Sequence, residues 1–531
     1  MERRWKRVLT SLAFGAAAGI AAGASGAAAA EPQAIIKERC QTCHVPTADG
    51  GWNRISEIRK SPEGWEMTLF RMNHVHKAGL SEDEARTLVK HLADTQGLAP
   101  SETADYRYIL ERKPHVQEAD ADAQLVETCA RCHSVARVAL QRRDAEEWNK
   151  LAHFHLGQFP SAEYQLFARD RNWWQIISQE MPPKLGERFP FKTAAWDAWA
   201  KAPKVEPVGT WRLFGTRPGV GTWGGSMTVS KAADGTYAVK YDLTGPDGKQ
   251  LSADGSAVVY TGYEWRGTVT LDGVPMRAIM ALSEDGASLK GRLFEAKHDE
   301  RGSTVVAVKA DGAARPLGMS ATAVKVGTTT RVTLWGENVK GLPDFGPGTT
   351  VTVVSQAADH TVLDIAAAAK AAPGPRDMTL GKAVLPAAIT VYDRIDSVRV
   401  EPELAVGRVG GNGGTTETLA AQFETVGYLN GPDGKPGTED DQRIGTFPAT
   451  WATAPNDAAA EAMQDVKFAG EMRPNGLFMP AVAGPNAQRT FGTNNVGDLK
   501  VTATVQDGKK TVSGDGRLVV TVQRWNDPPI H

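Results

Sequence analysis

The sequence predicts a multidomain α + β protein, with a helical N-terminal part followed by three antiparallel β domains. Three observations lead to this fold class. The chain has 531 residues, which at about 150 residues per domain is enough for three or four domains. Apolar residues recur at helical spacing up to about residue 203, and beyond Pro207 short alternating runs separated by turn residues replace them. Lys201 to Pro207, with Pro203 and Pro207, is the expected linker between the two parts.

The composition excludes some classes of protein, and the first residues indicate export. Hydrophobic residues make up 41% of the chain and the formal net charge is −2, so no basic surplus points to nucleic acid. Residues 1–30 carry basic residues from Arg3 to Arg7, then a short Ala-rich apolar run, then Ala28 and Ala30 in the positions of a signal-peptidase site. The run is too short for a good membrane span. We therefore expect a cleaved signal peptide and, if the source is a Gram-negative bacterium, a periplasmic protein.

All four cysteines belong to two C-x-x-C-H motifs, Cys40 to His44 and Cys129 to His133. This is the signature of covalent haem attachment, in which two thiols bond the haem vinyl groups and the following histidine binds the iron. A single motif of this kind is also compatible with a redox dithiol or half of a zinc site. Two copies that use every cysteine of an exported chain favour two c-type haems. The predicted covalent and proximal residues are Cys40, Cys43 and His44 for the first haem, and Cys129, Cys132 and His133 for the second.

The sequence after each motif also repeats. Ser61, followed by Pro62, is a helix N-cap signal, and Trp65 and Leu69 then fall on one helical face. After the second motif, Asp144 is the corresponding cap before Trp148. A capping box at residues 81–84 opens a further helix. We therefore predict a helical diheme cytochrome c domain over residues 31–203, made of two units at about 31–99 and 115–203.

Superposing the two copies gives candidates for the distal iron ligands. Met72 lies seven residues after Trp65, and His155 lies seven residues after Trp148. Two helical turns separate each pair, and thioether and imidazole are the common distal ligands of low-spin haem. We predict His44/Met72 for one haem and His133/His155 for the other, so that the two haems differ in potential. The competing distal candidates are His74 and His76 for the first haem, and His153 and Met181 for the second.

The remaining chain reads as antiparallel β structure. We expect a barrel-like domain over residues 204–313 and two immunoglobulin-like sandwiches over 314–393 and 394–531. The turn signals of the first of these are Asp234-Gly235, Pro246-Asp247-Gly248, Asp254-Gly255, Asp272-Gly273 and Asp285-Gly286.

No catalytic motif stands out in the β region, which lacks G-x-S-x-G, H-E-x-x-H and a phosphate loop. An acidic stretch from Gly431 to Asp441 is compatible with calcium, although a solvated turn is the plainer interpretation. Four tryptophans are expected to fill strand cores rather than an interface: Trp211, Trp223, Trp265 and Trp335. We interpret the β part as a scaffold or docking surface.

This arrangement resembles the α subunit of quinohemoprotein amine dehydrogenase. The two motifs with their Trp-led helices, followed by three cysteine-free β domains, carry the resemblance over essentially the whole mature chain. The resemblance implies a periplasmic αβγ heterotrimer with a β-propeller subunit and a small subunit that carries a cysteine tryptophylquinone. It implies that this quinone oxidises primary amines, and that the α subunit passes the electrons to a soluble cytochrome c or a blue copper protein. It also implies one bis-His and one His/Met haem.

Two alternatives remain open at this point. The first is a stand-alone diheme electron carrier or a peroxidase. A peroxidase would need a labile coordination position on one iron, together with a distal acid or base. A binding module with immunoglobulin-like domains would show a row of exposed aromatic residues on one sheet.

Overall fold

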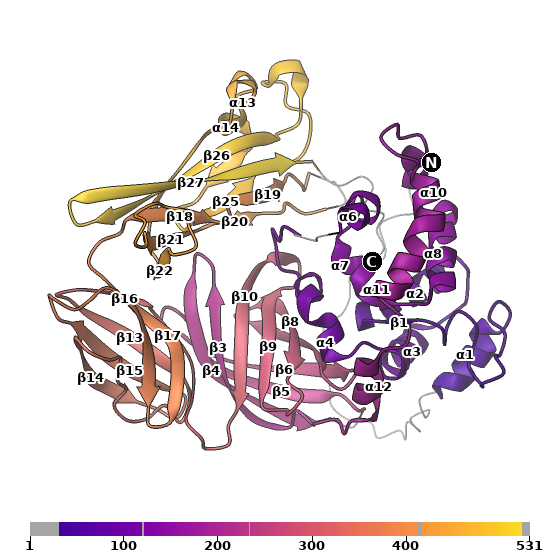
Figure 1. Ribbon diagram of the computed structural model, residues 1–531, viewed down its shortest axis with the longest axis horizontal. Helices are drawn as coiled ribbons and strands as arrows, with labels where there is room; N and C mark the ends of the chain where they lie inside the picture. Colours follow the sequence, from indigo (N-terminus) through magenta and orange to yellow (C-terminus); the bar gives the residue numbers. More distant parts are fainter. Residues whose placement is uncertain (1–30, 119–121, 233, 413–415, 523–531) are drawn as a thin grey trace, which may run out of the picture.

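The computed structural model describes residues 31–118, 122–232, 234–412 and 416–522, so the predicted signal peptide and the last nine residues lie outside the described part. The predicted fold class is confirmed. A helical part lies beside a closed eight-stranded barrel, and two further β domains follow (Figure 1). No helix of the described ranges has the length and apolarity that crossing a membrane requires.

The helical part contains mostly short helices. They are α1 (Pro32–Cys40), α2 (Pro62–His74), α3 (Glu82–Thr95), α4 (Pro100–Thr103), α5 (Arg107–Leu110), α6 (Ala123–Cys129), α7 (Val135–Ala139), α8 (Ala145–Gln158), α9 (Ser161–Leu166), α10 (Trp173–Gln175), α11 (Met181–Arg188) and α12 (Ala194–Lys201), with a 3₁₀ turn η1 (Ala104–Tyr106) and a π-helical turn η2 (Ile176–Glu180).

The predicted helix caps are confirmed. Ser61 Oγ accepts a hydrogen bond from Gly64 N at 3.2 Å, and Ser81 forms the capping box with Glu84. Asp144 accepts from the backbone of Glu147 at 2.7 Å. These caps satisfy amide groups that the first helical turn leaves without partners, so α2, α3 and α8 begin where the sequence indicates.

The two haem-motif units meet across a short antiparallel ribbon. Strands β1 (Arg59–Lys60) and β2 (Gln141–Arg142) pair so that Arg59 lies opposite Arg142. Each strand leads directly into the Trp-bearing helix of its own unit, and Trp65 and Trp148 are both buried in the core of their unit. The sequence repeat is therefore also a structural repeat.

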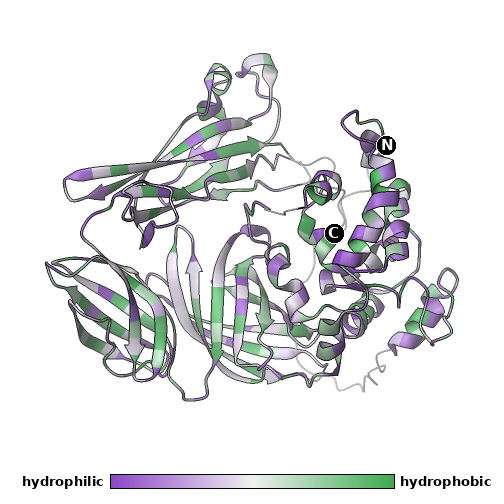
Figure 2. Cartoon of the chain, in the orientation of Figure 1, coloured by the Kyte–Doolittle hydropathy of each residue, from purple (hydrophilic) through white to green (hydrophobic). Residues whose placement is uncertain are grey.

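The barrel is closed in the order β10-β3-β4-β5-β6-β7-β8-β9. Its strands are β3 (Gly209–Arg217), β4 (Gly221–Lys231), β5 (Tyr237–Thr244), β6 (Gln250–Tyr260), β7 (Glu264–Leu271), β8 (Val274–Leu282), β9 (Ser288–Glu295) and β10 (His298–Lys309). Hydrophobic and hydrophilic residues alternate along them (Figure 2). As predicted, Trp211, Trp223 and Trp265 are buried in the barrel core.

One predicted turn is wrong. Asp254-Gly255 lies inside β6 rather than between strands. A Cβ at Gly255 would come within 2.4 Å of Thr268 O on the neighbouring strand. The glycine therefore permits a close approach of two backbones in the curved wall, which is the other common use of glycine in a strand.

The two C-terminal β domains are built from several sheets each. The first has a four-stranded sheet β11-β13-β15-β14 and a three-stranded sheet β12-β17-β16, and the second has sheets β18-β21-β22, β19-β27-β26-β23 and β20-β25-β24. The strands of the first are β11 (Arg315–Met319), β12 (Ala323–Lys325), β13 (Thr329–Glu337), β14 (Thr349–Gln356), β15 (His360–Ala367), β16 (Gly374–Leu380) and β17 (Ala383–Tyr392). The second comprises β18 (Ser397–Glu401), β19 (Leu404–Arg408), β20 (Ala421–Gln422), β21 (Glu424–Leu429), β22 (Gln442–Thr446), β23 (Thr450–Pro455), α13 (Ala458–Ala462), α14 (Asp465–Phe468), β24 (Gly470–Met472), β25 (Leu477–Pro480), η3 (Thr490–Gly492), β26 (Gly497–Asp507) and β27 (Lys510–Thr521).

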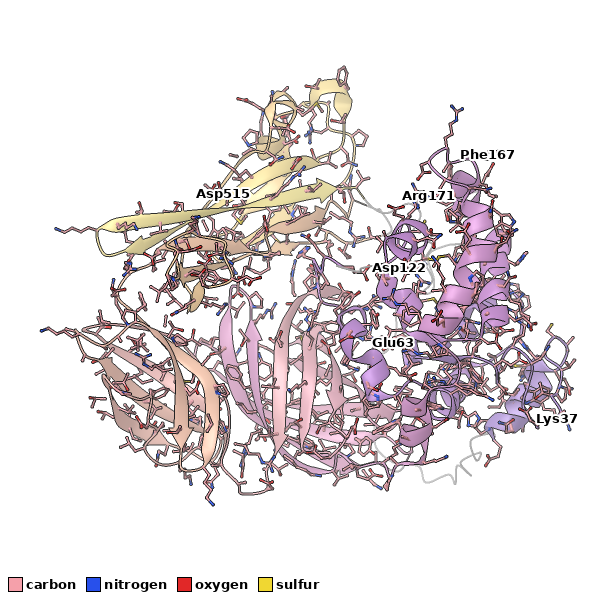
Figure 3. The ribbon with its side chains drawn as sticks, in the orientation of Figure 1. Lys37, Glu63, Asp122, Phe167, Arg171 and Asp515 are labelled. Atoms are coloured by element: carbon pink, nitrogen blue, oxygen red, sulfur yellow. The ribbon has the colours of Figure 1, made fainter. Side chains whose placement is uncertain are left out.

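Two ion pairs and a hydrogen bond join the helical part to the barrel. Arg266 of β7 binds Glu63 of α2 at 2.6 Å, and Glu63 is labelled in Figure 3 where the helices face the barrel. Arg107 of α5 binds Glu264 at 2.6 Å. Trp199 of α12 donates to Thr261 O at 2.9 Å. These contacts fix the haem-motif units on a rigid support.

Candidate haem sites

The first motif follows the end of α1. Cys40 is the last residue of that helix, and His44 N continues the turn by donating to Cys40 O at 2.9 Å. His44 Nδ1 donates to Asn53 O at 2.9 Å. A carbonyl oxygen can only accept, so this bond places the imidazole proton on Nδ1 and leaves Nε2 as the ligating atom, as in most histidines that bind metal.

The second motif repeats this arrangement. Cys129 ends α6, and His133 Nδ1 donates to Ser134 O at 3.0 Å. Burial lowers the pKa of His133 to about 4, with smaller contributions from the charges of Arg137 and His155. The neutral imidazole, which is the form that binds iron, is therefore the stable one at neutral pH.

One thiol of each motif lies in surroundings that disfavour a redox dithiol. All four cysteines are free of disulfides. Burial raises the pKa of Cys129 to about 12, and burial with the neighbouring Cys43 raises the pKa of Cys40. Reactive C-x-x-C dithiols have a lowered thiol pKa, so these environments disfavour that alternative.

The distal candidate His155 lies on the helix of the second unit that carries Trp148. His155 lies on α8, half-buried, and its Nδ1 donates to Leu151 O at 2.8 Å. Burial lowers its pKa, and the charges of Arg137 and Arg71 act in the same direction. The charge of His155 in turn contributes to lowering the pKa of His133, so the two imidazoles lie within electrostatic range of each other.

Met72 lies in the last turn of α2, half-buried, in the unit that holds His44. Helices α1 and α2 both pack against α3, which places the first motif and the helix of Met72 around one core. That core also includes Trp65 and Leu69, as the sequence predicted.

The competing candidates have other surroundings. His74 and His76 are exposed, and the His74 ring stacks on Phe70 with centroids 3.9 Å apart. His153 is exposed against Trp174. Met181 is 1% exposed inside the apolar core of the second unit, so protein side chains already enclose it. The assignment of Met72 and His155 stays a prediction.

Three cations at the junction of the two units were missed by the sequence reasoning. Lys60 is 4% exposed, Arg71 stands over the ring of Phe154 at 5.1 Å, and Arg137 Nη2 reaches Met67 Sδ at 2.8 Å. Burial, together with nearby arginines, holds the pKa of Lys60 well below its usual value. The repeat contains a signal for the first of them, because Lys60 and Arg143 both lie five residues before the tryptophan of their unit.

The acidic stretch near Asp433 has no metal-binding arrangement among the described residues, where no group of three acidic, histidine or cysteine side chains converges. Asp441 pairs with Arg399, and Asp440 accepts from Thr438 Oγ1 at 2.7 Å.

Comparison with known families accounts for almost the whole chain. Models of the quinohemoprotein amine dehydrogenase alpha subunit match at residues 30–196 for haem binding, 205–310 for domain II, 314–393 for domain III and 398–530 for domain IV. The chain belongs to this family. The quinohemoprotein amine dehydrogenase alpha subunit is part of an oxidoreductase, and the family's haem-binding region coincides with the helical part that contains both motifs.

Other comparisons add little. No curated protein matches. Solved structures match parts of the chain: a redesigned beta barrel bound to DFHBI is 14% identical, covering 19% of this chain and 93% of its own, with a TM-score of 0.17. Mouse clustered PcdhgC3 EC1-3 is 11% identical, covering 45% of this chain and 76% of its own, with a TM-score of 0.17. At such scores the likenesses carry no argument.

Proposed function

We propose that this alpha subunit is an electron relay with two covalently bound haems, which accepts electrons from a cysteine tryptophylquinone in a partner subunit and delivers them to a soluble cytochrome c or blue copper protein. The observation that carries the proposal is the structural repeat. Each unit offers a thiol pair, a proximal histidine with its Nδ1 fixed by a backbone carbonyl, and a distal candidate two helical turns beyond a buried tryptophan.

The residues present fit two haems of the c type. Cys40 and Cys43 would hold the first haem, and Cys129 and Cys132 would hold the second. In each motif the first cysteine ends a helix, and the second cysteine and the histidine follow in the next turn of the chain. A bound haem supplies a one-electron carrier whose potential depends on its axial ligands. Met72 paired with His44, and His155 paired with His133, would give the two haems unequal potentials, which suits a relay.

The junction between the units supports a short path between the two sites. Arg71 and Phe154 occupy equivalent positions of the repeat, one residue before Met72 and His155. Their side chains contact each other at 5.1 Å across the junction. The side chains of the residues next to the two distal candidates therefore lie against each other.

The division of labour with partner subunits follows from what this chain offers. Its residues position and insulate redox groups, and none of the catalytic motifs sought in the sequence occurs in the β domains. We assign amine oxidation to a small quinone-bearing subunit, held with a β-propeller subunit in an αβγ heterotrimer of the periplasm. The family membership supports this assignment.

The test uses the complex purified from its native source. A primary alkylamine added to the oxidised complex should reduce the haems, as seen in their absorbance, whereas this chain expressed alone with its haems should stay oxidised. If the native complex stays oxidised with every amine tried, the amine dehydrogenase role is wrong and a stand-alone diheme carrier or peroxidase becomes the better explanation.

A further inference from the structure

We propose that Lys60, Arg71 and Arg137 form a receptor for the propionate carboxylates of the second haem, and that these cations raise the potential of that haem. The inference rests on the proposed function, since it requires a haem at the motif Cys129 to His133. These three residues are the junction cations.

Lys60 is the most enclosed of the three. Its side chain is 4% exposed, and its Nζ donates to Thr68 Oγ1 at 2.7 Å while standing over the ring of Trp65 at 5.5 Å. No carboxylate oxygen of the described residues lies within ion-pair distance of this Nζ. A buried ammonium group with only a hydroxyl partner is unfavourable unless an anion completes the site.

Arg71 also lacks a carboxylate partner among the described residues. Its Nη2 lies 3.5 Å from Thr68 Oγ1, and its Nε is buried without a hydrogen-bond partner among the described residues. The guanidinium presents donors in a planar fork that suits a carboxylate. Arg137 approaches from the second unit, where its Nη2 reaches Met67 Sδ on α2. The guanidinium groups of Arg71 and Arg137 therefore approach the same junction from opposite units.

The neighbouring buried arginines have carboxylate partners, so within the part of the chain that the structure describes the lack of such a partner is specific to Lys60 and Arg71. Arg59 binds Glu102 at 2.8 Å, and Arg142 binds the same carboxylate at 3.1 Å. Arg143, the repeat equivalent of Lys60, lies 3.5 Å from Glu147. The described part of the chain thus provides a carboxylate for each of these arginines and none for Lys60 or Arg71.

The position of the junction cations identifies the carboxylates. Arg71 stands on Phe154, the residue before His155, and Arg137 lies on α7 directly after His133 and Ser134. The cluster is therefore beside the second site, and a c-type haem carries two carboxylates at the edge remote from its thioether bonds. A free inorganic anion offers the same chemistry, so the test must separate these two sources.

The test measures the midpoint potential of each haem in the full haem-loaded chain by spectroelectrochemical titration, with the bis-His and His/Met haems distinguished by their spectra. One unit charge at about 10 Å in a medium of effective dielectric constant about 20 changes an equilibrium roughly ten-fold. Arg71→Leu should therefore make reduction of the second haem less favourable by roughly ten-fold, which corresponds to about 59 mV for one electron. Arg71→Lys should restore most of the loss.

Lys60→Met is the second variant, since it lies far from every axial candidate in sequence, and it should lower the same potential. Arg86→Leu, which removes a cation from the exposed face of α3, is the control. The proposal is overturned if both R71L and K60M match R86L, if only the first haem shifts, or if the wild-type potential depends on added inorganic phosphate. A wild-type chain that binds no haem at the second motif would instead overturn the proposed function.

Discussion

Replacing Glu102 by glutamine should loosen the junction on which both haem units depend. Its carboxylate accepts from Arg59 Nη1 at 2.8 Å and Nη2 at 2.9 Å, from Arg142 Nε at 3.1 Å and from Thr193 Oγ1 at 2.9 Å. Glu102 is 8% exposed and the two arginines 2% and 6%. Arg59 and Arg142 lie opposite each other in the β1–β2 ribbon, so this single carboxylate pairs with one buried arginine from each unit.

The magnitude follows from burial. Removing one partner of a buried ion pair costs about 3–5 kcal/mol, because the remaining charge stays out of water without compensation. Glu102→Gln leaves two such charges, so we expect the free energy of unfolding of the helical part to fall by at least about 3 kcal/mol. This is a large fraction of the roughly 5–15 kcal/mol that stabilises a typical domain.

The ionisation of Glu102 should also affect how the free energy of unfolding depends on pH. Burial alone would raise the pKa of Glu102, but its pairing with Arg59 and Arg142 holds that pKa below the usual value. A carboxyl whose folded pKa is depressed stabilises fully above its unfolded pKa, about 4.3, and loses this contribution as pH falls through the folded pKa. The wild-type protein should therefore lose stability below about pH 4, and Glu102→Gln should flatten part of that slope.

The assay is urea unfolding of the haem-loaded chain at pH 7 and at about pH 3, followed through the haem absorbance. Glu82→Gln, on the exposed first turn of α3, is the matched control and should change stability by less than about 0.5 kcal/mol. Equal midpoints for Glu102→Gln and Glu82→Gln would refute the argument that the ribbon depends on this anion.

Three further predictions concern the sites themselves. Replacing Cys129 and Cys132 by alanine should leave one covalent haem on the chain, and the mass of the denatured protein should fall by one haem relative to wild type. Met72→His should give the first haem the spectrum of a bis-His haem and a lower potential, and His155→Met should raise the potential of the second; unchanged spectra would assign the distal ligands elsewhere. Trp65→Ala removes a side chain that is 1% exposed and donates to Gln96 O at 3.1 Å, so urea unfolding should show a loss of about 3–5 kcal/mol, and a loss under 1 kcal/mol would contradict the packing described for the first unit.

Much of the fold could be predicted because its signals are local. The caps at Ser61, Ser81 and Asp144 act within one helical turn, and each begins a helix at the expected residue. Alternating runs such as Glu264 to Thr270 became strands for the same reason. The turn predicted at Asp254-Gly255 was wrong because a glycine in a turn and a glycine that lets two strands approach closely look the same in the sequence.

The junction was not predictable from spacing in the sequence. Glu102 meets Arg59 across 43 residues and Arg142 across 40 residues, so no pattern within one helix or strand reveals the pairing. No sequence pattern marks Arg71 or Arg137 as enclosed. The pairing of β1 with β2 brings the two units of the repeat together, and these side chains then lie between the units.

A single-turnover reaction tests the central claim most directly, which is that this chain carries two haems that act in series behind an amine-oxidising partner. The oxidised native complex is mixed rapidly with a primary alkylamine in the absence of any soluble acceptor, and the absorbance of each haem is followed. The account predicts that both haems become reduced, one after the other, and that adding a soluble cytochrome c or blue copper protein reoxidises them. Reduction of one haem alone, or of neither, would contradict it.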